Sequence, residues 1–506
     1  MSYRGGVAMW PSNDILLQIG GIVWSTLVTA ELVIRYFMIG IVPGNRRPTT
    51  AMAWLLAIFF IPVVGLVAYW LFANPRLSRR RLEKQKRAHD EIMRGTAHMR
   101  LPDEFHSKEE WVESAVILNR NLGAMPLEGG NTIEVISDYR GSMQAMVKEI
   151  DKAKRYVHIQ FYIMGDDPDY VDPVLDSLEA AVKRGVNVRL LFDHLGTLRV
   201  SGYRDFKKRL KRSGINWRPM LPIDLVGRRW RRPDLRNHRK ILVVDGAVAF
   251  TGSQNLIEPG YKRKAAHKVG REWVEMMLRV EGPLVRSLDV TFATDWWQED
   301  DNQEVLLDIT EARHPLPQDE RPGTTMAQVL PSGPGFGVEN NLRLFNTLIY
   351  SASERLMITS PYFVPDDSLL YAITTAAQRG VEVDLFVCEE GDQFLVHHAQ
   401  QSYYQALLDA GVRIYCYPAP MVLHTKCFTV DNEVAVVGSS NMDMRSFSLN
   451  MEISVMLLGQ DMVDAVNKVQ NDYRAISSEI TSAQWRRRPR MQRWIDNVAR
   501  LTATLQ

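Results

Sequence analysis

The chain has 506 residues, which is more than one ordinary hydrophobic core uses, so we expect a small number of domains. Its 61 lysines and arginines nearly balance 59 aspartates and glutamates, so net charge points to no class of partner and local clusters must carry that argument. Three cysteines (Cys388, Cys416 and Cys427) show neither metal-ligand spacing nor a disulfide framework, which argues against a disulfide-stapled secreted scaffold and fits a reducing compartment.

Two apolar segments lie near the amino terminus. Residues 15–42 are mostly apolar and residues 51–73 contain no charged residue, so each segment is long enough to span a bilayer. A cleaved signal peptide does not fit, because the first run is too long and a second follows. We therefore expect a transmembrane helical hairpin over residues 1–73. Glu31 and Arg35 are four positions apart, where they can neutralise each other on one helix face or snorkel to the interface.

A basic cluster follows the second apolar segment, whereas the short connection of the hairpin holds only Arg46 and Arg47. The positive-inside rule then predicts a multi-pass protein of the cell membrane, with the rest of the chain and the amino terminus on the cytoplasmic side. A solvated helix face is the plainer explanation of such a run, but the position of the cluster directly beside a span favours contact with anionic lipid headgroups. Its members are Arg76, Arg79, Arg80, Arg81, Lys84, Lys86 and Arg87.

Beyond a charged helical connector over residues 74–130, the chain is predicted to form two similar α/β units, residues 131–325 and 326–506. In the first unit, a strand at 157–163 precedes a helix at 175–182 and a strand at 188–192. The second unit repeats this order at 356–364, 369–377 and 383–387. Strand-helix-strand order favours a parallel or mixed sheet with helices outside, so we predict a duplicated α/β fold.

Two segments combine tryptophan with arginine. The segment from Gly214 to His238 in the first half is 11 residues longer than the equivalent segment from Gly411 to His424 in the second half, and it includes residues 228–232 (Arg-Arg-Trp-Arg-Arg). Residues 485–490 have a similar composition. A lipid-headgroup boundary suits such a mixture, with nucleic-acid contact and a plain solvent loop as alternatives. Trp494, Val498 and Leu501 then fall at helical spacing, which predicts a short amphipathic helix that lies on the bilayer or packs on the body.

One pattern of residues occurs twice with the same internal spacing. Each copy begins at a histidine. Counted from that histidine, lysine lies two positions later, aspartate seven positions later, a Gly-Ser pair starts fourteen positions later, and asparagine lies seventeen positions later. The first copy is formed by His238, Lys240, Asp245, Gly252, Ser253 and Asn255. The second is formed by His424, Lys426, Asp431, Gly438, Ser439 and Asn441. Only two of the eleven histidines begin the full pattern, so isolated core histidines are a poor explanation.

Both copies are predicted to form a strand, a tight turn and a returning strand. Side chains two apart on a strand share a face, so histidine and lysine should lie side by side while Cys427 turns to the core. Lysine, amide and hydroxyl donors around a histidine suit a phosphate, and glycine would permit close approach of the ligand. Asp245 and Asp431 belong to the pattern, but we interpret them as turn and support residues.

Two such half-sites facing each other would place one histidine on each side of a phosphorus atom. One histidine can attack as the nucleophile, while the other protonates the departing alkoxide and later deprotonates the acceptor. Charge on the phosphoryl oxygens would be held by Lys240, Lys426, Asn255 and Asn441. This scheme requires neither a metal ion nor another cofactor.

The repeated pattern resembles the duplicated HKD signature of the phospholipase D superfamily, and further segments are similar to bacterial cardiolipin synthases (residues 238–261, 279–283, 330–334, 358–365 and 439–446). The resemblance implies two phospholipase D-like α/β/α sandwich units that share one active site. It also implies that two phosphatidylglycerol molecules give cardiolipin and glycerol through a phosphatidyl-histidine intermediate. His238 is then the nucleophile and His424 the general acid/base. In the family, an acidic residue shortly after each motif orients the histidines, and in this chain these residues correspond to Glu275 and Glu452, with Glu272 as the alternative to Glu275.

Other functions remain open from the sequence. A hydrolytic phospholipase D would use the same residues with water as the acceptor. A nuclease of the superfamily needs no membrane hairpin, and a non-catalytic membrane scaffold would not need every reactive residue in both copies. We therefore expect phosphatidylglycerol and anionic membrane lipid as partners and no nucleic acid.

Overall fold

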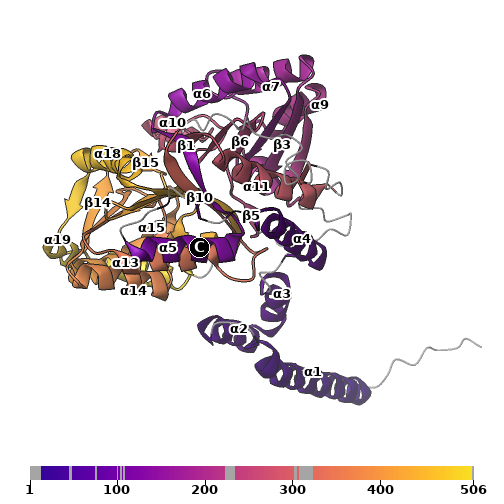
Figure 1. Cartoon of the computed structure of the whole chain (residues 1–506). Helices are drawn as coiled ribbons and strands as arrows, with labels where there is room; N and C mark the ends of the chain where they lie inside the picture. The colour runs from indigo at the N-terminus through magenta and orange to yellow at the C-terminus, as the bar shows by residue number, and fades with distance from the viewer. Residues whose placement is uncertain are drawn as a thin grey trace, which may run out of the picture. The chain divides into compact units, whose positions relative to one another are not determined.

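The computed structural model describes residues 13–44, 48–73, 77–97, 99, 101–102, 105, 109–222, 234–300, 305–306 and 323–503. The chain forms two compact units, Met1–Pro75 and Arg76–Gln506 (Figure 1). Arg46, Arg47, Arg76 and the basic stretch at 228–232 lie outside the described residues, so the expectations attached to them stay predictions.

The first unit is helical. Helix α1 (Asn13–Ile41) contains the segment Gly21–Ile41, which is long and apolar enough to cross a membrane. Glu31 and Arg35 form an ion pair within it, as their four-residue spacing predicts. The Arg35 guanidinium also lies 5.5 Å from the centre of the Phe59 ring.

The second apolar segment corrects the expectation of one transmembrane helix over residues 51–73. It forms two short helices instead, α2 (Pro48–Phe60) and α3 (Pro62–Phe72). Pro62 causes the break, because proline has no backbone N–H and its ring excludes the carbonyl group four residues earlier. The second apolar segment is therefore not one continuous helix, and the membrane hairpin itself stays a prediction. Of the helices in the described part of the chain, only the one containing Gly21–Ile41 has spanning length and composition.

The second unit is built on one 16-stranded sheet that passes through both halves. The strands of the first half are β1 (Leu127–Ile136), β2 (Tyr156–Phe161), β3 (Asn187–Asp193), β4 (Asn216–Met220), β5 (Arg236–Asn237), β6 (Ile241–Val244), β7 (Val248–Gly252) and β9 (Met277–Glu281). Those of the second half are β10 (Thr325–Ser332), β11 (Arg355–Thr359), β13 (Glu382–Cys388), β14 (Arg413–Tyr417), β16 (Cys427–Val430), β17 (Val434–Gly438), β19 (Asn450–Leu458) and β20 (Ser478–Ile480).

The strand order shows the duplication directly. Strands β1 and β10 pair antiparallel at the centre of the sheet. Outward from them, the first half follows β9-β7-β6-β2-β3-β4 and the second follows the equivalent order β19-β17-β16-β11-β13-β14, with β20 at the edge. Strands β2, β3 and β4 are parallel, as are the equivalent strands β11, β13 and β14. The hairpin strands and the edge strand β20 pair antiparallel, so the predicted mixed sheet is confirmed.

Helices cover both faces of each half, which confirms the α/β/α arrangement. Leu242 and Val244 face helices α6 (Tyr139–Lys152) and α7 (Asp172–Lys183), whereas Ile241 and Val243 face α11 (Leu284–Glu299). In the second half, α13 (Asn340–Ser351) and α14 (Asp367–Gln378) lie on one face and α18 (Gln460–Ile476) on the other. Cys427 is buried in the core as expected.

One predicted strand in the second half is shorter than expected. The stretch 356–364 forms β11, which ends at Thr359, and the separate strand β12 (Phe363–Val364). Pro361 lies in the gap and cannot donate a ladder hydrogen bond. The interruption places Tyr362 outside the sheet.

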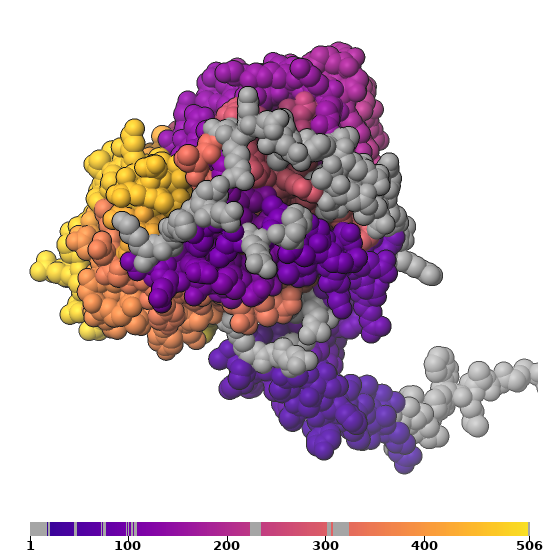
Figure 2. Space-filling view, viewed as in Figure 1, coloured from indigo at the N-terminus to yellow at the C-terminus, as the bar shows by residue number. Residues whose placement is uncertain are grey.

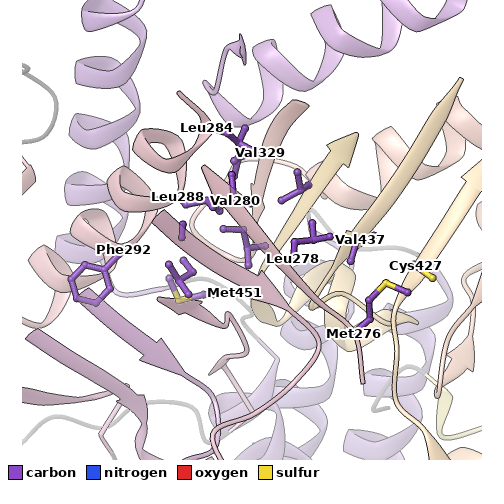
Figure 3. Close-up of a cluster of buried hydrophobic side chains, with 14 of the residues drawn as sticks. Met276, Leu278, Val280, Leu284, Leu288, Phe292, Val329, Cys427, Val437 and Met451 are labelled. Atoms are coloured by element: carbon purple, nitrogen blue, oxygen red, sulfur yellow. The ribbon is translucent and has the colours of Figure 1, made fainter. Parts of the chain in front are cut away.

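A single hydrophobic cluster crosses from one half to the other. It includes Leu278 and Val280 of β9, Val329 of β10, Val437 of β17 and Met451 of β19 (Figure 3). Because the two halves share this core, neither can be detached without exposing apolar surface to water.

The charged connector packs on this body. Helix α4 (Arg79–Gly95) packs on α11, and α5 (Glu110–Gly123) packs on α13 and β10. In the space-filling view, deep purple atoms of this region form a band between the magenta first half and the orange second half (Figure 2). The basic cluster is divided as a result, since Arg81 is buried while Arg79, Arg80, Lys86 and Arg87 are exposed.

We predict that Arg81→Ala destabilises the second unit by about 3 kcal/mol, because it leaves Glu299 buried without its cation. Gln298 loses a hydrogen bond from the same guanidinium, at 3.1 Å. The measurement is denaturant unfolding of the purified protein, together with protease cleavage within α4. The double variant Arg81→Ala with Glu299→Gln should lose less unfolding free energy than Arg81→Ala alone. Equal losses of unfolding free energy would contradict a role for the buried charge.

Candidate active site

Each histidine of the repeated pattern is positioned by a strand from the opposite half. His238 follows β5, which pairs in parallel with the start of β19. His424 follows β15 (Val422–Leu423), which pairs in parallel with β8 (Trp273–Val274). The backbone N–H of His238 donates to the Met451 carbonyl and that of His424 to the Val274 carbonyl, each at 2.8 Å. Both acceptors immediately precede a glutamate in the sequence.

The two glutamates contact the histidines crosswise. Glu452 Oε2 lies 2.9 Å from Nδ1 of His238, and Glu275 Oε1 lies 2.7 Å from Nδ1 of His424. The residues quoted for the resemblance are thus brought together, but each acidic partner comes from the other half. Glu272 is exposed and provides only its backbone carbonyl, to Val422. Glu275 is therefore the side chain that contacts His424.

Burial decides the charge states of these pairs. It lowers the pKa of His238 to about 4 and also lowers the pKa of His424, although the adjacent carboxylate opposes the shift in each case. Burial raises the pKa of Glu452 and of Glu275, but the adjacent histidine and lysine outweigh it and hold both pKa values below the ordinary range. Each pair is then a neutral imidazole and a carboxylate. With Nδ1–H donated to the carboxylate, the lone pair of the imidazole lies on Nε2.

The two lysines lie beside the histidines and connect the half-sites electrostatically. Lys240 donates to the carbonyl of His238, and Lys426 donates to that of His424. Burial lowers the pKa of Lys240 to about 7 and that of Lys426 to about 8. Lys426 also contributes to the lowered pKa of His238, and Lys240 to that of His424. A bound phosphate would restore the positive charge on both ammonium groups.

The segment from 238 to 240 is irregular rather than part of a strand, but the expected alternation of faces holds. Arg239 points away from its neighbours and is buried, with Nη1 donating to Asp295 Oδ1 at 2.6 Å. Its Nε donates to the backbone carbonyl of Glu452 at 2.9 Å. Arg239 therefore holds the strand that carries the carboxylate partner of His238.

The serines of the pattern have equivalent contacts in the two halves, whereas the asparagines differ. Ser439 donates to the carbonyl of Ile453 and Ser253 to that of Met276, and each serine also lowers the pKa of the glutamate in its own half by a side-chain hydrogen bond. Asn255 accepts from the Ile163 N–H and donates to the Tyr261 hydroxyl, so both its functional groups contact protein. Asn441 is buried, and its Oδ1 accepts no hydrogen bond within the described residues.

The two glycines correct the expectation that they permit close approach of a ligand. A Cβ at Gly252 would lie 2.3 Å from the carbonyl oxygen of Met276, and one at Gly438 would lie 2.4 Å from that of Ile453. Glycine is needed because the neighbouring strand approaches closely.

Three tyrosines that were not among the predicted site residues complete the surroundings. The ring of Tyr162 lies 4.8 Å from that of His238, and the ring of Tyr362 lies 6.1 Å from that of His424. Both follow equivalent strands, β2 and β11, and the internal repeat could have identified them. Tyr261 donates to Glu275 Oε1 at 2.9 Å. Tyr261 follows His238 by 23 positions, and the residue that follows His424 by 23 positions is Phe447, which has no hydroxyl. The two half-sites are therefore chemically unequal.

The two aspartates of the pattern lie at the hairpin turns, away from the histidines. Asp245 has a positive φ of 54° and accepts from the backbone N–H groups of residues 154–156, each at 2.8 Å. Asp431 has a φ of 50° and accepts from the N–H groups of residues 353–355 at 2.8–2.9 Å. Both geometries agree with the turn and support interpretation. No group of three or more potential metal ligands occurs among the residues the structure describes.

The chain is similar to known proteins over most of its length. The family model described as "Cardiolipin synthase, PLD-like domain" matches residues 146–296 and 345–474, and the model "Phospholipase_D-nuclease N-terminal" matches residues 32–74. Cardiolipin synthase A of Serratia proteamaculans (strain 568) is 34% identical over 478 residues, which cover 94% of this chain and 96% of the relative.

Cardiolipin synthase A of Yersinia pseudotuberculosis serotype O:1b (strain IP 31758) is 35% identical over 470 residues, covering 92% of this chain and 95% of the relative. Among solved structures, phosphatidylserine synthase of Haemophilus influenzae Rd KW20 is similar with a TM-score of 0.58 and 16% identity. That match covers 79% of this chain and 100% of the other, and it shows the fold alone.

We predict that Asp245→Asn and Asp431→Asn lower stability but spare catalysis, because each aspartate contacts backbone at a turn and neither contacts a histidine. Loss of the carboxylate charge should cost on the order of 1–2 kcal/mol of unfolding free energy per variant. The checks are the thermal midpoint and the initial rate well below it. Glu452→Gln is the matched control, expected to lose activity at nearly unchanged midpoint. An inactive but fully stable Asp245→Asn would contradict the assignment.

Proposed function

Because the chain belongs to the bacterial cardiolipin synthases of the phospholipase D superfamily and is thus a phosphatidyltransferase, we propose that it joins two phosphatidylglycerol molecules through a phosphatidyl-histidine. The observation that carries the proposal is the pair of crossed histidine–glutamate contacts, with two buried lysines acting on both histidines. The products are cardiolipin and glycerol.

In the first step, Nε2 of His238 attacks the phosphorus of the donor lipid. The phosphorus–oxygen bond to the terminal glycerol breaks. His424, which is neutral in the empty site, is proposed to take up a proton on Nε2 when the anionic phosphate binds beside it, and it gives this proton to the departing oxygen. In the second step, neutral His424 takes the proton of the acceptor hydroxyl as that oxygen attacks phosphorus and releases His238. The Glu275 carboxylate stabilises the imidazolium form of His424, at 2.7 Å from Nδ1.

The assignment of roles rests on the inequality of the two half-sites. The pKa of His238 is lowered to about 4, so its imidazole is neutral and nucleophilic over the whole physiological range. Lys240, Lys426 and Asn441 are proposed to hold the phosphoryl oxygens. Asn255 is proposed to act through Tyr261, because its amide already donates to the tyrosine hydroxyl.

Transfer of the phosphatidyl group to an alcohol rather than to water requires that the intermediate be shielded from solvent. His238 and His424 are only 8% and 5% exposed, which supports transfer over hydrolysis. We also propose that the first unit attaches the enzyme to the membrane through α1 and that the second unit lies on the cytoplasmic side. The exposed basic residues of α4 support this side, by the positive-inside rule.

The two histidines should be needed for different steps. His238→Ala should abolish covalent labelling of the protein by a phosphatidyl donor, since the attacking nitrogen is removed. His424→Ala should still be labelled by a donor with a good leaving group, which needs no protonation. Labelled phosphatidyl donor and peptide mapping provide the measurement. An adduct on His424 would reverse the roles, and the absence of any adduct would refute covalent catalysis.

Removal of residues 1–75 should leave a chain that still forms cardiolipin on phosphatidylglycerol vesicles, because every residue of the site lies in the second unit. Exposed lysines and arginines each contribute on the order of 1 kcal/mol near an anionic surface, so binding should weaken as salt rises. Vesicle sedimentation and lipid product analysis across a salt series test this. A folded truncation that binds vesicles without making product would show that the first unit contributes to the site.

A further inference from the structure

The last helix, α20 (Arg490–Arg500), has one face buried in the second unit and an opposite face that is bare and apolar. Asp496 and Ala499 are 1% and 2% exposed. The outward face consists of large apolar side chains, Met491 at 67% exposed, Trp494 at 62%, Val498 at 43% and, just past the helix, Leu501 at 81%. At 3.6 residues per turn, these two sets fall on opposite sides of the helix.

A neighbouring helix extends this apolar face. Helix α15 (Phe394–Gln401) packs against α20, and His398 Nδ1 lies 2.7 Å from Asp496 Oδ1. Phe394 and Leu395, at the start of α15, are 66% and 52% exposed, and the ring of Phe394 lies 4.4 Å from that of His398. We call the set Phe394, Leu395, Met491, Trp494, Val498 and Leu501 the α15–α20 surface.

The rim of the α15–α20 surface is positively charged. Arg487, Arg490 and Arg493 are exposed, and none has a carboxylate partner within the described part of the chain. Arg488 differs, because it is paired with the buried Asp496 at 2.7 Å. A soluble surface rarely leaves such an apolar patch bare, and tryptophan with flanking arginines is the composition of helices that lie at a lipid interface.

We propose that the α15–α20 surface inserts shallowly into an anionic phospholipid bilayer and so presents the histidine site to its lipid substrate. The apolar side chains enter the boundary of the acyl region, while the arginines contact lipid phosphates. An anionic bilayer fits this surface because its acyl region can bury the apolar side chains while its phosphates pair with the exposed arginines.

The position of the surface in the chain links it to the site. Asp392 lies two residues before Phe394 and accepts a hydrogen bond from the Tyr362 hydroxyl at 2.8 Å. The ring of Tyr362 lies 6.1 Å from that of His424. Arg263 Nη1 contacts the same aspartate at 3.0 Å. The bilayer contact therefore adjoins the wall of the active site, and this part of the inference rests on the proposed function.

A probe on the helix tests the contact in the full chain. Cys388, Cys416 and Cys427 are buried, so a thiol-reactive fluorophore should label an introduced Met491→Cys selectively. The labelled protein is reconstituted into phosphatidylglycerol vesicles that contain brominated lipid. We expect quenching of the probe at 491 and none of a probe placed by Lys183→Cys, at the exposed end of α7. A probe at 491 that is not quenched, or that transfers energy to a second labelled copy, overturns the proposal.

A functional arm uses matched variants. Trp494→Ser with Leu501→Ser should lower kcat/KM on vesicles about 10- to 100-fold, because a shallow insertion gains only part of the free energy of fully burying two large apolar side chains. On short-chain phosphatidylglycerol in micelles the same variant should keep its rate. The control is Ile117→Ser with Ile476→Ser, which removes apolar side chains that are 47% and 55% exposed elsewhere.

Equal losses on vesicles and micelles would overturn the proposal, because they would show that Trp494 and Leu501 support the fold of the site. The proposal would also be overturned if the control variant lost as much kcat/KM on vesicles as the variant of Trp494 and Leu501. Failure of the proposed chemistry is distinguishable, since the absence of a His238 adduct leaves the quenching result unchanged.

Discussion

Each histidine of this enzyme depends on a carboxylate that the other half of the chain provides. The arrangement follows from two short parallel pairings, β5 with β19 and β15 with β8, which place each histidine backbone beside the residue preceding a glutamate. The central pairing of β1 with β10 and the common core fix the distance between the halves. Without that rigid junction, neither imidazole would have a defined tautomer or a directed lone pair.

The cost of this arrangement is the burial of two lysines and two carboxylates around two imidazoles. Burial lowers the pKa of both lysines and both histidines, so the empty site holds less positive charge than its composition suggests. An entering phosphate diester replaces lost hydration with ammonium and amide donors that are already in place. These features support the proposal that the site binds a phosphate rather than a neutral ligand.

Much of the architecture follows from the sequence because it depends on local periodicity. Strand alternation correctly predicts that Cys427 turns into the core, and the repeat of strand, helix and strand predicts the duplicated sheet. Local chemistry also explains one failure, since Pro62 forbids the continuous second helix that apolar composition alone suggested. The role of Gly252 was misread because the strand it approaches is remote in sequence.

The crossing of the two half-sites is a tertiary property that spacing within one copy does not encode. Glu452 lies 214 residues after His238, so His238 precedes its partner by much of the chain. Synthesis proceeds from the amino terminus, and a chain completed only through the first half has His238 without its carboxylate. The chemistry proposed for His238 therefore cannot begin until the second half of the chain has been made and has folded against the first.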